Sequence, residues 1–128
     1  MDGSEGLETL REAFDEANGI LFGFPVYNYS MNSSLKAAIE HFGHSMNDKV
    51  IGLMMSAGGR ASYMSGLAVA NSLMLDFRSW VTPRFVYATK DAFGDGRVTD
   101  PEIESRVEEL AWTVYEKAWQ HRQIPPGA

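Results

Sequence analysis

Residues 19–43 decide the fold, and they read GILFGFPVYNYSMNSSLKAAIEHFG. The first five, Gly19–Gly23, are uniformly apolar, which is typical of a short strand covered on both faces. The second half predicts a helix that begins after Ser33 and Ser34 and ends at Gly43. Its apolar residues recur at helical spacing and are Leu35, Ala38, Ile39 and Phe42. The stretch therefore predicts a strand, a connecting loop and an amphipathic helix.

The rest of the chain alternates between the same two patterns. A helical stripe behind Ser4, a suitable N-cap, precedes the strand, and a long helix opens with Thr99–Glu102, which resembles a capping box. Residues 122–128 form an irregular tail, and no linker or repeat divides residues 1–128, which predicts a single domain. The other predicted elements are a strand at Val50–Met55, a helix at Tyr63–Phe77, and a strand at Val81 and Arg84–Ala88 interrupted near Pro83.

Strands separated by helices predict parallel pairing through right-handed crossovers. The fold class is therefore α/β, a three-layer parallel sheet of three strands with four helices. In such folds ligands lie at the carboxyl ends of the strands. Two segments occupy that place, Phe24–Ser30 after the first strand and Ser56–Arg60 after the second.

Both segments contain residues suited to a flat ligand. Tyr27 and Tyr29 could flank a ring, and free backbone N–H groups near the following helix could donate to its polar atoms. Gly58 and Gly59 would let a planar ligand approach the backbone, and Arg60 could meet a phosphate or carboxylate. An ordinary turn with gap-filling tyrosines, and a solvated arginine, are the alternative interpretations.

Residues 25–31, PVYNYSM, followed by residues 35–40, LKAAIE, resemble the flavin loop and the next helix of NADPH-dependent FMN reductases. That family typically reads P-E-Y-N-x-S and then L-K-N-A-I-D, so Val26 stands where a glutamate is usual. Ser56–Gly59 resembles the family's second ring loop. Residues from Trp80 to Gly96 resemble its last strand and the approach to its final helix.

The resemblance implies a flavodoxin-like fold that binds FMN and takes hydride from NAD(P)H, with a quinone, an azo compound or free flavin as the acceptor. It implies no catalytic acid or base and no metal site, because the cofactor carries the chemistry. The implied cofactor-binding residues are Pro25, Val26, Tyr27, Asn28, Tyr29, Ser30, Ser56, Ala57, Gly58, Gly59 and Arg60.

The resemblance also indicates a missing part. Members of the family begin with a strand, a phosphate-binding loop and a second strand, and this chain resembles only the later part of such a protein. The sheet would then keep three strands, and its new edge at Ile20–Phe22 would expose apolar backbone to water. A homodimer, or a partner chain that supplies the missing strands, is expected to cover it. Trp112 and Trp119, on the outer face of the last helix, also predict a covered surface.

The composition of the chain argues against several classes of function. The net charge of −6 argues against nucleic-acid partners, and no apolar run approaches the ~20 residues that span a bilayer. The chain has no cysteine, which excludes disulfides and thiolate chemistry, and its acidic start lacks a signal-peptide pattern. A cytoplasmic flavoprotein subunit is expected. The alternatives are a non-catalytic partner subunit with vestigial flavin loops and a self-associating scaffold that binds no flavin.

Overall fold

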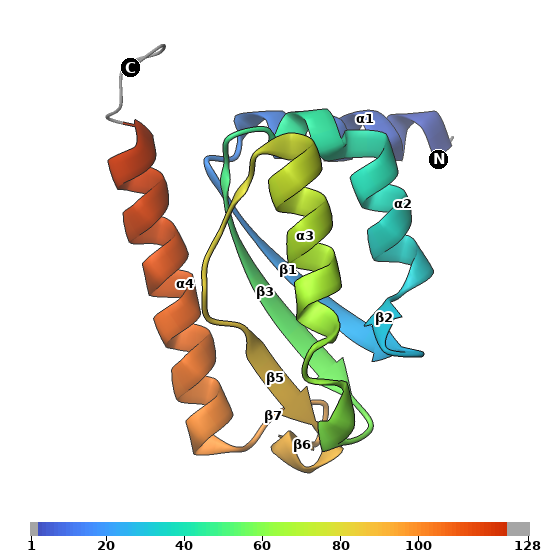
Figure 1. Ribbon diagram of the computed structural model, residues 1–128, viewed down its shortest axis with the longest axis vertical. Helices are drawn as coiled ribbons and strands as arrows, with labels where there is room; N and C mark the ends of the chain where they lie inside the picture. The colour runs from blue at the N-terminus through green and yellow to red at the C-terminus, as the bar shows by residue number, and fades with distance from the viewer. Residues whose placement is uncertain (1–2, 123–128) are drawn as a thin grey trace.

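The computed structural model describes residues 3–122, and its centre is a parallel sheet (Figure 1). The middle strand β3 (Val50–Ala57) pairs along one side with β1 (Gly19–Tyr27), in a register running from Gly19 opposite Val50 to Pro25 opposite Ser56. Along its other side β3 pairs first with β4 (Trp80–Val81) and then with β5 (Val86–Thr89). All three pairings are parallel, as the alternation of strands and helices predicts.

Helices cover both faces of this sheet. Figure 1 shows α4 on one side of the strands and α2 and α3 on the other, so the predicted three-layer α/β fold with four α-helices is confirmed. The helices are α1 (Gly3–Glu16), α2 (Ser33–Phe42), α3 (Ser65–Phe77) and α4 (Pro101–Arg122). The short elements are β2 (Ser30–Met31), β6 (Phe93–Gly94) and β7 (Arg97–Val98), with 3₁₀ turns η1 (Gly43–Met46), η2 (Arg60–Ser62) and η3 (Lys90–Ala92).

The core consists of two apolar clusters, one on each face of the sheet. Phe22 and Leu53 pack with Ile39 of α2 and Leu73 of α3 in the larger cluster. The smaller cluster joins β3 and β5 to the inner face of α4, whose buried residues are Leu110, Val114 and Ala118. Helical spacing places these residues on one stripe with Ile103, Val107 and Ala111, and Ile103 and Val107 pack against the same cluster. Each fully buried aliphatic or aromatic side chain of this kind contributes about 1.5–3 kcal/mol to folding.

Strand β1 is buried on one face rather than both, which corrects the prediction for Gly19–Gly23. Ile20 and Phe22 point into the larger cluster, whereas Leu21 is 40% exposed and Gly23 is exposed. The cause is that α4 lies mainly across β3 and leaves the neighbouring part of that face uncovered.

Helix ends differ from the predicted ones in four places. Helix α1 already begins at Gly3, so Ser4 lies within the helix, and α3 begins at Ser65 instead of Tyr63. The cap of α4 is Asp100, whose carboxylate accepts the Glu102 N–H at 2.9 Å, and not Thr99. Arg122 is the last residue of α4, and the remainder of the predicted tail lies outside the described residues.

Gly43 follows α2 in right-handed geometry and opens η1, so it is not a left-handed cap. It is a glycine for packing reasons, because an added Cβ would come within 2.0 Å of the Phe77 ring. The third predicted strand is divided. Residues 82–85 leave the sheet between β4 and β5, around Pro83, and this gap opens a pocket against α4.

Candidate functional site

The first predicted loop is a β-hairpin. Strand β1 continues through Tyr27, and β2 returns antiparallel with Val26 opposite Met31 and Tyr27 opposite Ser30. The two turn residues, Asn28 and Tyr29, both have left-handed backbone conformations, with φ of 52° and 60°. Two consecutive left-handed residues are what a tight two-residue hairpin turn requires. Pro25, Val26 and Tyr27 are therefore strand residues, and the predicted loop is confined to the turn.

The hairpin divides the predicted flavin residues between core and surface. Val26 is buried in the larger apolar cluster, and Pro25 is half-buried. Tyr27 and Tyr29 are 61% and 67% exposed, and Asn28 and Ser30 are exposed beside them. The surface formed by Tyr27–Ser30 can contact a ligand, whereas Val26 supports it from inside.

The second predicted segment begins inside β3. Ser56 and Ala57 are the last, half-buried residues of that strand, Gly58 and Gly59 are exposed, and Arg60 opens η2. A Cβ added to Gly58 or Gly59 meets no atom within 4 Å. The chain's own packing therefore does not require glycine at either position, and the space above the backbone is open.

Tyr87 supports the second segment, and sequence reasoning did not assign it this role. Its hydroxyl donates a hydrogen bond to the Gly59 carbonyl, and its ring meets the Tyr63 ring edge-on at 5.6 Å. Tyr87 is the second residue of β5 and is half-buried, and the alternation along that strand places it on the face of the larger cluster, opposite the face of Val86. That alternation is the signal in the sequence that could have identified it.

The two segments are neighbours because their strands are. Pro25 lies opposite Ser56 in the β1–β3 pairing, so Tyr27 and Gly58 each come two residues later at adjacent strand ends. Neighbouring strands are about 4.8 Å apart, which places aromatic side chains and bare backbone within reach of one flat molecule. Apart from Arg60 and the tyrosines, residues 25–30 and 56–60 carry no ionisable side chain. Such a surface can bind and orient a ring.

Arg60 lies on the far side of the second segment. It lines a cavity of about 450 Å³ together with Tyr63, Tyr87, a second arginine, Arg106, and three carboxylic acids, Asp91, Asp100 and Glu102. Arg106 forms a 2.8 Å ion pair with Glu102, which leaves two carboxylates, Asp91 and Asp100, beside Arg60. Because carboxylates repel a phosphate, this cavity is a poor place for a phosphate group to meet Arg60. The start of α2 at Ser33 has Asn32 as its N-cap, without a side-chain capping hydrogen bond.

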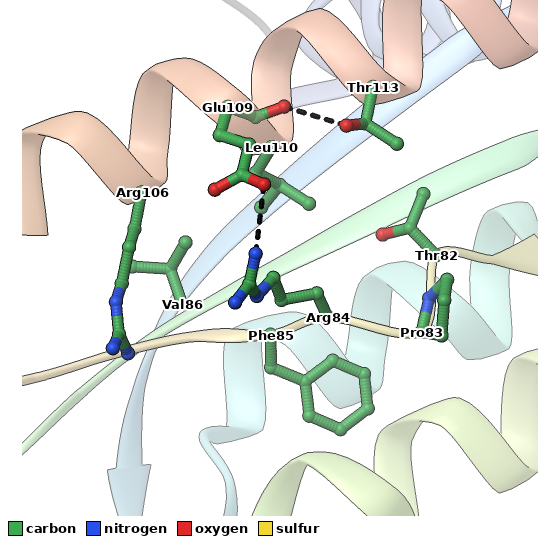
Figure 2. A pocket seen from close by; sticks show the side chains of 9 residues that line it. All are labelled: Thr82, Pro83, Arg84, Phe85, Val86, Arg106, Glu109, Leu110 and Thr113. Carbon is green, nitrogen blue, oxygen red and sulfur yellow. Dashed lines mark hydrogen bonds and ion pairs between the residues drawn. The ribbon is translucent and has the colours of Figure 1, made fainter.

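A separate pocket of about 170 Å³ lies where the chain leaves the sheet between β4 and β5 (Figure 2). Figure 2 shows Arg84 reaching from this segment to Glu109 on α4, where the two groups form a 2.8 Å ion pair across the pocket. Val86 points toward α4, and Phe85 points away from it. The pocket contains none of the predicted flavin residues.

Residues 3–122 contain neither a metal-binding cluster nor a membrane-spanning helix. No three histidine, aspartate or glutamate side chains in that range gather closely enough to hold a metal ion. None of the helices in the same range combines the length and apolar character needed to cross a membrane.

Comparison with known proteins agrees with the fold and with the sequence resemblance. An NAD(P)H-dependent FAD/FMN reductase of Geobacillus thermodenitrificans is 29% identical over 121 residues, which are 91% of this chain and 64% of that protein. The apo crystal structure of an NADH:FMN oxidoreductase superposes with a TM-score of 0.76 at 16% identity, over 91% of this chain and 62% of the other. The flavoenzyme NAD(P)H:acceptor oxidoreductase FerB of Paracoccus denitrificans gives 0.73 at 19% identity, over 94% and 71%.

The chain thus spans somewhat less than two thirds of the curated relative it matches. Residues 2–93, which include the hairpin and the glycine segment, match the family model for NADPH-dependent FMN reductases. Because that match covers more than half of the chain and the fold is flavodoxin-like α/β, this chain belongs to the NADPH-dependent FMN reductase family.

Proposed function

We propose that the chain binds the isoalloxazine ring of FMN between Tyr27–Ser30 and Ser56–Arg60, as part of an NAD(P)H-dependent flavin oxidoreductase. The observation that carries this proposal is the open backbone at Gly58 and Gly59 beside the exposed Tyr27 and Tyr29. When bound, the flavin accepts hydride from NAD(P)H and passes electrons to an acceptor such as a quinone, an azo compound or free flavin. A cytoplasmic location, where NAD(P)H is available, fits this proposal.

The protein's own part in this chemistry is to hold and orient the ring. The two tyrosines supply aromatic surface, and the glycines let the ring lie against backbone N–H and C=O groups. Tyr87 positions the glycine segment through its hydrogen bond to the Gly59 carbonyl. The residues present fit the ring. Among residues 3–122 the cavity at Arg60 is less suited to the phosphate, because Asp91 and Asp100 line it and its second arginine, Arg106, is paired with Glu102.

A second candidate function is a non-catalytic partner subunit that retains the ring segments without using them. The observation that favours it is that carboxylates line the cavity at Arg60, where a phosphate would have to bind. It predicts a purified chain that retains no yellow colour once excess FMN has been removed by gel filtration, whereas the first proposal predicts saturable quenching of flavin fluorescence.

The test is a flavin titration of the parent chain and of Gly58→Val. The added side chain has room in the free protein, since no atom lies within 4 Å of the new Cβ, but it occupies the space proposed for the ring. We expect flavin affinity to fall at least tenfold, which corresponds to about 1.4 kcal/mol of binding free energy. The circular dichroism spectrum should not change.

The matched control is Gly6→Val. Gly6 lies in α1, its added Cβ also meets no atom within 4 Å, and Figure 1 places α1 at the opposite end of the strands from the hairpin. This variant should keep the parent affinity. Equal flavin affinity in Gly58→Val and the parent would remove the glycine segment from the site.

A further inference from the structure

The outer edge of β1 is an unfinished edge of the sheet. β1 pairs with β3 along one side, and on the other side β2 pairs only with Val26 and Tyr27. Among residues 3–122 no strand pairs with Gly19–Pro25 on that side. Alternate residues of this stretch therefore present unpaired backbone groups outward, with Pro25 contributing a C=O but no N–H, and together they are a template for another strand.

The face beside this edge is apolar and open. Leu21 lines a groove of about 380 Å³ between β1 and α4, together with Ala111, Tyr115 and Trp119. Trp112 extends the same aromatic face of α4, with its ring 5.6 Å from that of Tyr115. All three aromatic side chains are more than half exposed. Clustered exposed aromatics next to an open edge are typical of a protein interface.

We propose that the occupant is a second copy of this chain, docked about a two-fold axis so that the two β1 strands pair antiparallel. The length of the free edge sets the register. Because β2 blocks the edge beyond Pro25, the free residues 19–25 pair symmetrically about Phe22. Leu21 then lies opposite Gly23 of the partner subunit.

This register is complementary to itself. A two-fold axis pairs residues of the same parity, so the buried side chains of β1, at even positions, stay on one face in both copies. On the α4 face each Leu21 meets a glycine, which leaves space above the strands for larger groups.

The aromatic side chains of α4 suit that space. Since α4 lies across β3, two paired β1 strands would separate the two α4 helices by three strand spacings, about 14 Å. Helices in direct contact are usually 8–10 Å apart. Rings as large as those of Trp112, Tyr115 and Trp119 from each copy can fill the wider gap.

The first test is the native mass of the purified chain by sedimentation, which needs no flavin and so does not depend on the proposed function. We expect a dimer at micromolar concentration. Leu21→Lys should shift it to monomer by placing two ammonium groups at the interface, while Leu75→Lys, at an exposed position of α3, should remain dimeric. Circular dichroism checks that both variants fold.

A second pair of variants tests the interface even if Leu21→Lys does not fold. Trp119→Ala should raise the dimer dissociation constant at least tenfold, whereas Trp80→Ala, which removes an equally exposed tryptophan from β4, should leave it unchanged. In addition, the chain has no cysteine, so Leu21→Cys introduces a single thiol. In the proposed register two copies of that residue are diagonal neighbours, about 7–8 Å apart. A short bifunctional maleimide should link them, and should not link Leu75→Cys.

A folded particle of monomer mass would overturn the proposal and favour a different chain that supplies the strands. Large, open-ended assemblies would overturn it too, because a two-fold contact closes at two copies. A dimer that survives both Leu21→Lys and Trp119→Ala would place the contact elsewhere.

Discussion

Tyr29 is the residue at which local strain and the proposed site coincide. It is a bulky residue with left-handed backbone geometry, at φ of 60°, next to Asn28, which tolerates that geometry better. A non-glycine residue held there costs about 1–2 kcal/mol. Strain of this kind gathers at functional sites, and Tyr29 also presents its ring to solvent at the strand ends proposed to hold the flavin.

Replacing Tyr29 with glycine should therefore have opposite effects on stability and on binding. We expect Tyr29→Gly to increase the free energy of unfolding by about 1 kcal/mol, because glycine adopts the left-handed turn without strain. Flavin affinity should fall, because one aromatic wall is lost. Urea unfolding and flavin titration measure the two effects. A variant that is less stable than the parent, or that binds flavin equally well, would contradict this account.

At the scale of elements, an ion pair links the end of α3 to the start of β3. Arg78 just after α3 donates from Nε and Nη2 to the two carboxylate oxygens of Asp48 just before β3, both at 3.2 Å. The Asp48 N–H also donates to the Phe77 carbonyl at 3.2 Å. The hydrogen bond from Arg78 holds the pKa of Asp48 below its usual value of 3.8.

This pair predicts a pH-dependent effect of Asp48→Asn. A carboxyl group whose pKa is lower in the folded state stabilises the protein above its unfolded pKa and loses that contribution as pH falls through the folded value. The variant should therefore melt below the parent at pH 7, and the difference should shrink as the pH falls below about 3.8. Asparagine also adopts the left-handed backbone of residue 48 readily, and any change in melting temperature from this cause would be the same at every pH. Melting differences that do not change between pH 7 and pH 2.5 would contradict a charge effect.

The sequence predicted the order of these elements because their periodicity is strong, and it failed where three-dimensional context decides. The apolar residues of β3 and the inner stripe of α4 lie where their spacing placed them. Uniform apolarity at Gly19–Gly23 could not show that Leu21 lacks a covering helix. The hairpin was missed because its turn reads Asn28-Tyr29, and tyrosine gives no signal for left-handed geometry.

At the scale of the whole molecule, the sequence resemblance predicted an open sheet edge at Ile20–Phe22. The described structure has an unpaired β1 edge, and helix α1 has no fully buried residue. The open backbone at Gly58 and Gly59 was expected from residues 56–60, and their contact with a flavin ring stays a prediction. The contact of Tyr87 with Gly59 depends on a strand pairing that brings distant residues together.

We therefore expect the chain to bind the isoalloxazine ring of FMN more strongly than its phosphate. The proposed ring site at Tyr27–Ser30 and Ser56–Gly59 carries no charge, whereas Arg60 shares its cavity with Asp91, Asp100 and the ion pair of Arg106 with Glu102. A net charge of −6 also opposes a dianionic phosphate at long range. One charge-assisted hydrogen bond to a phosphate contributes about 1.5–3 kcal/mol, or roughly ten- to a hundredfold in affinity. A chain with an intact phosphate site would therefore prefer FMN to riboflavin, which has the same ring without the phosphate, by more than tenfold.

For this chain alone we expect FMN and riboflavin to bind with nearly equal, weak affinities. The measurement is a pair of fluorescence titrations under the same conditions, at low and at physiological salt. Riboflavin should be nearly insensitive to salt, while FMN should bind slightly better as salt screens the repulsion between its phosphate and the acidic chain. A preference for FMN above tenfold that weakens with salt would contradict this expectation. It would indicate a phosphate site, and Arg60→Ala and Ser33→Ala would then show whether the glycine segment or the start of α2 provides it.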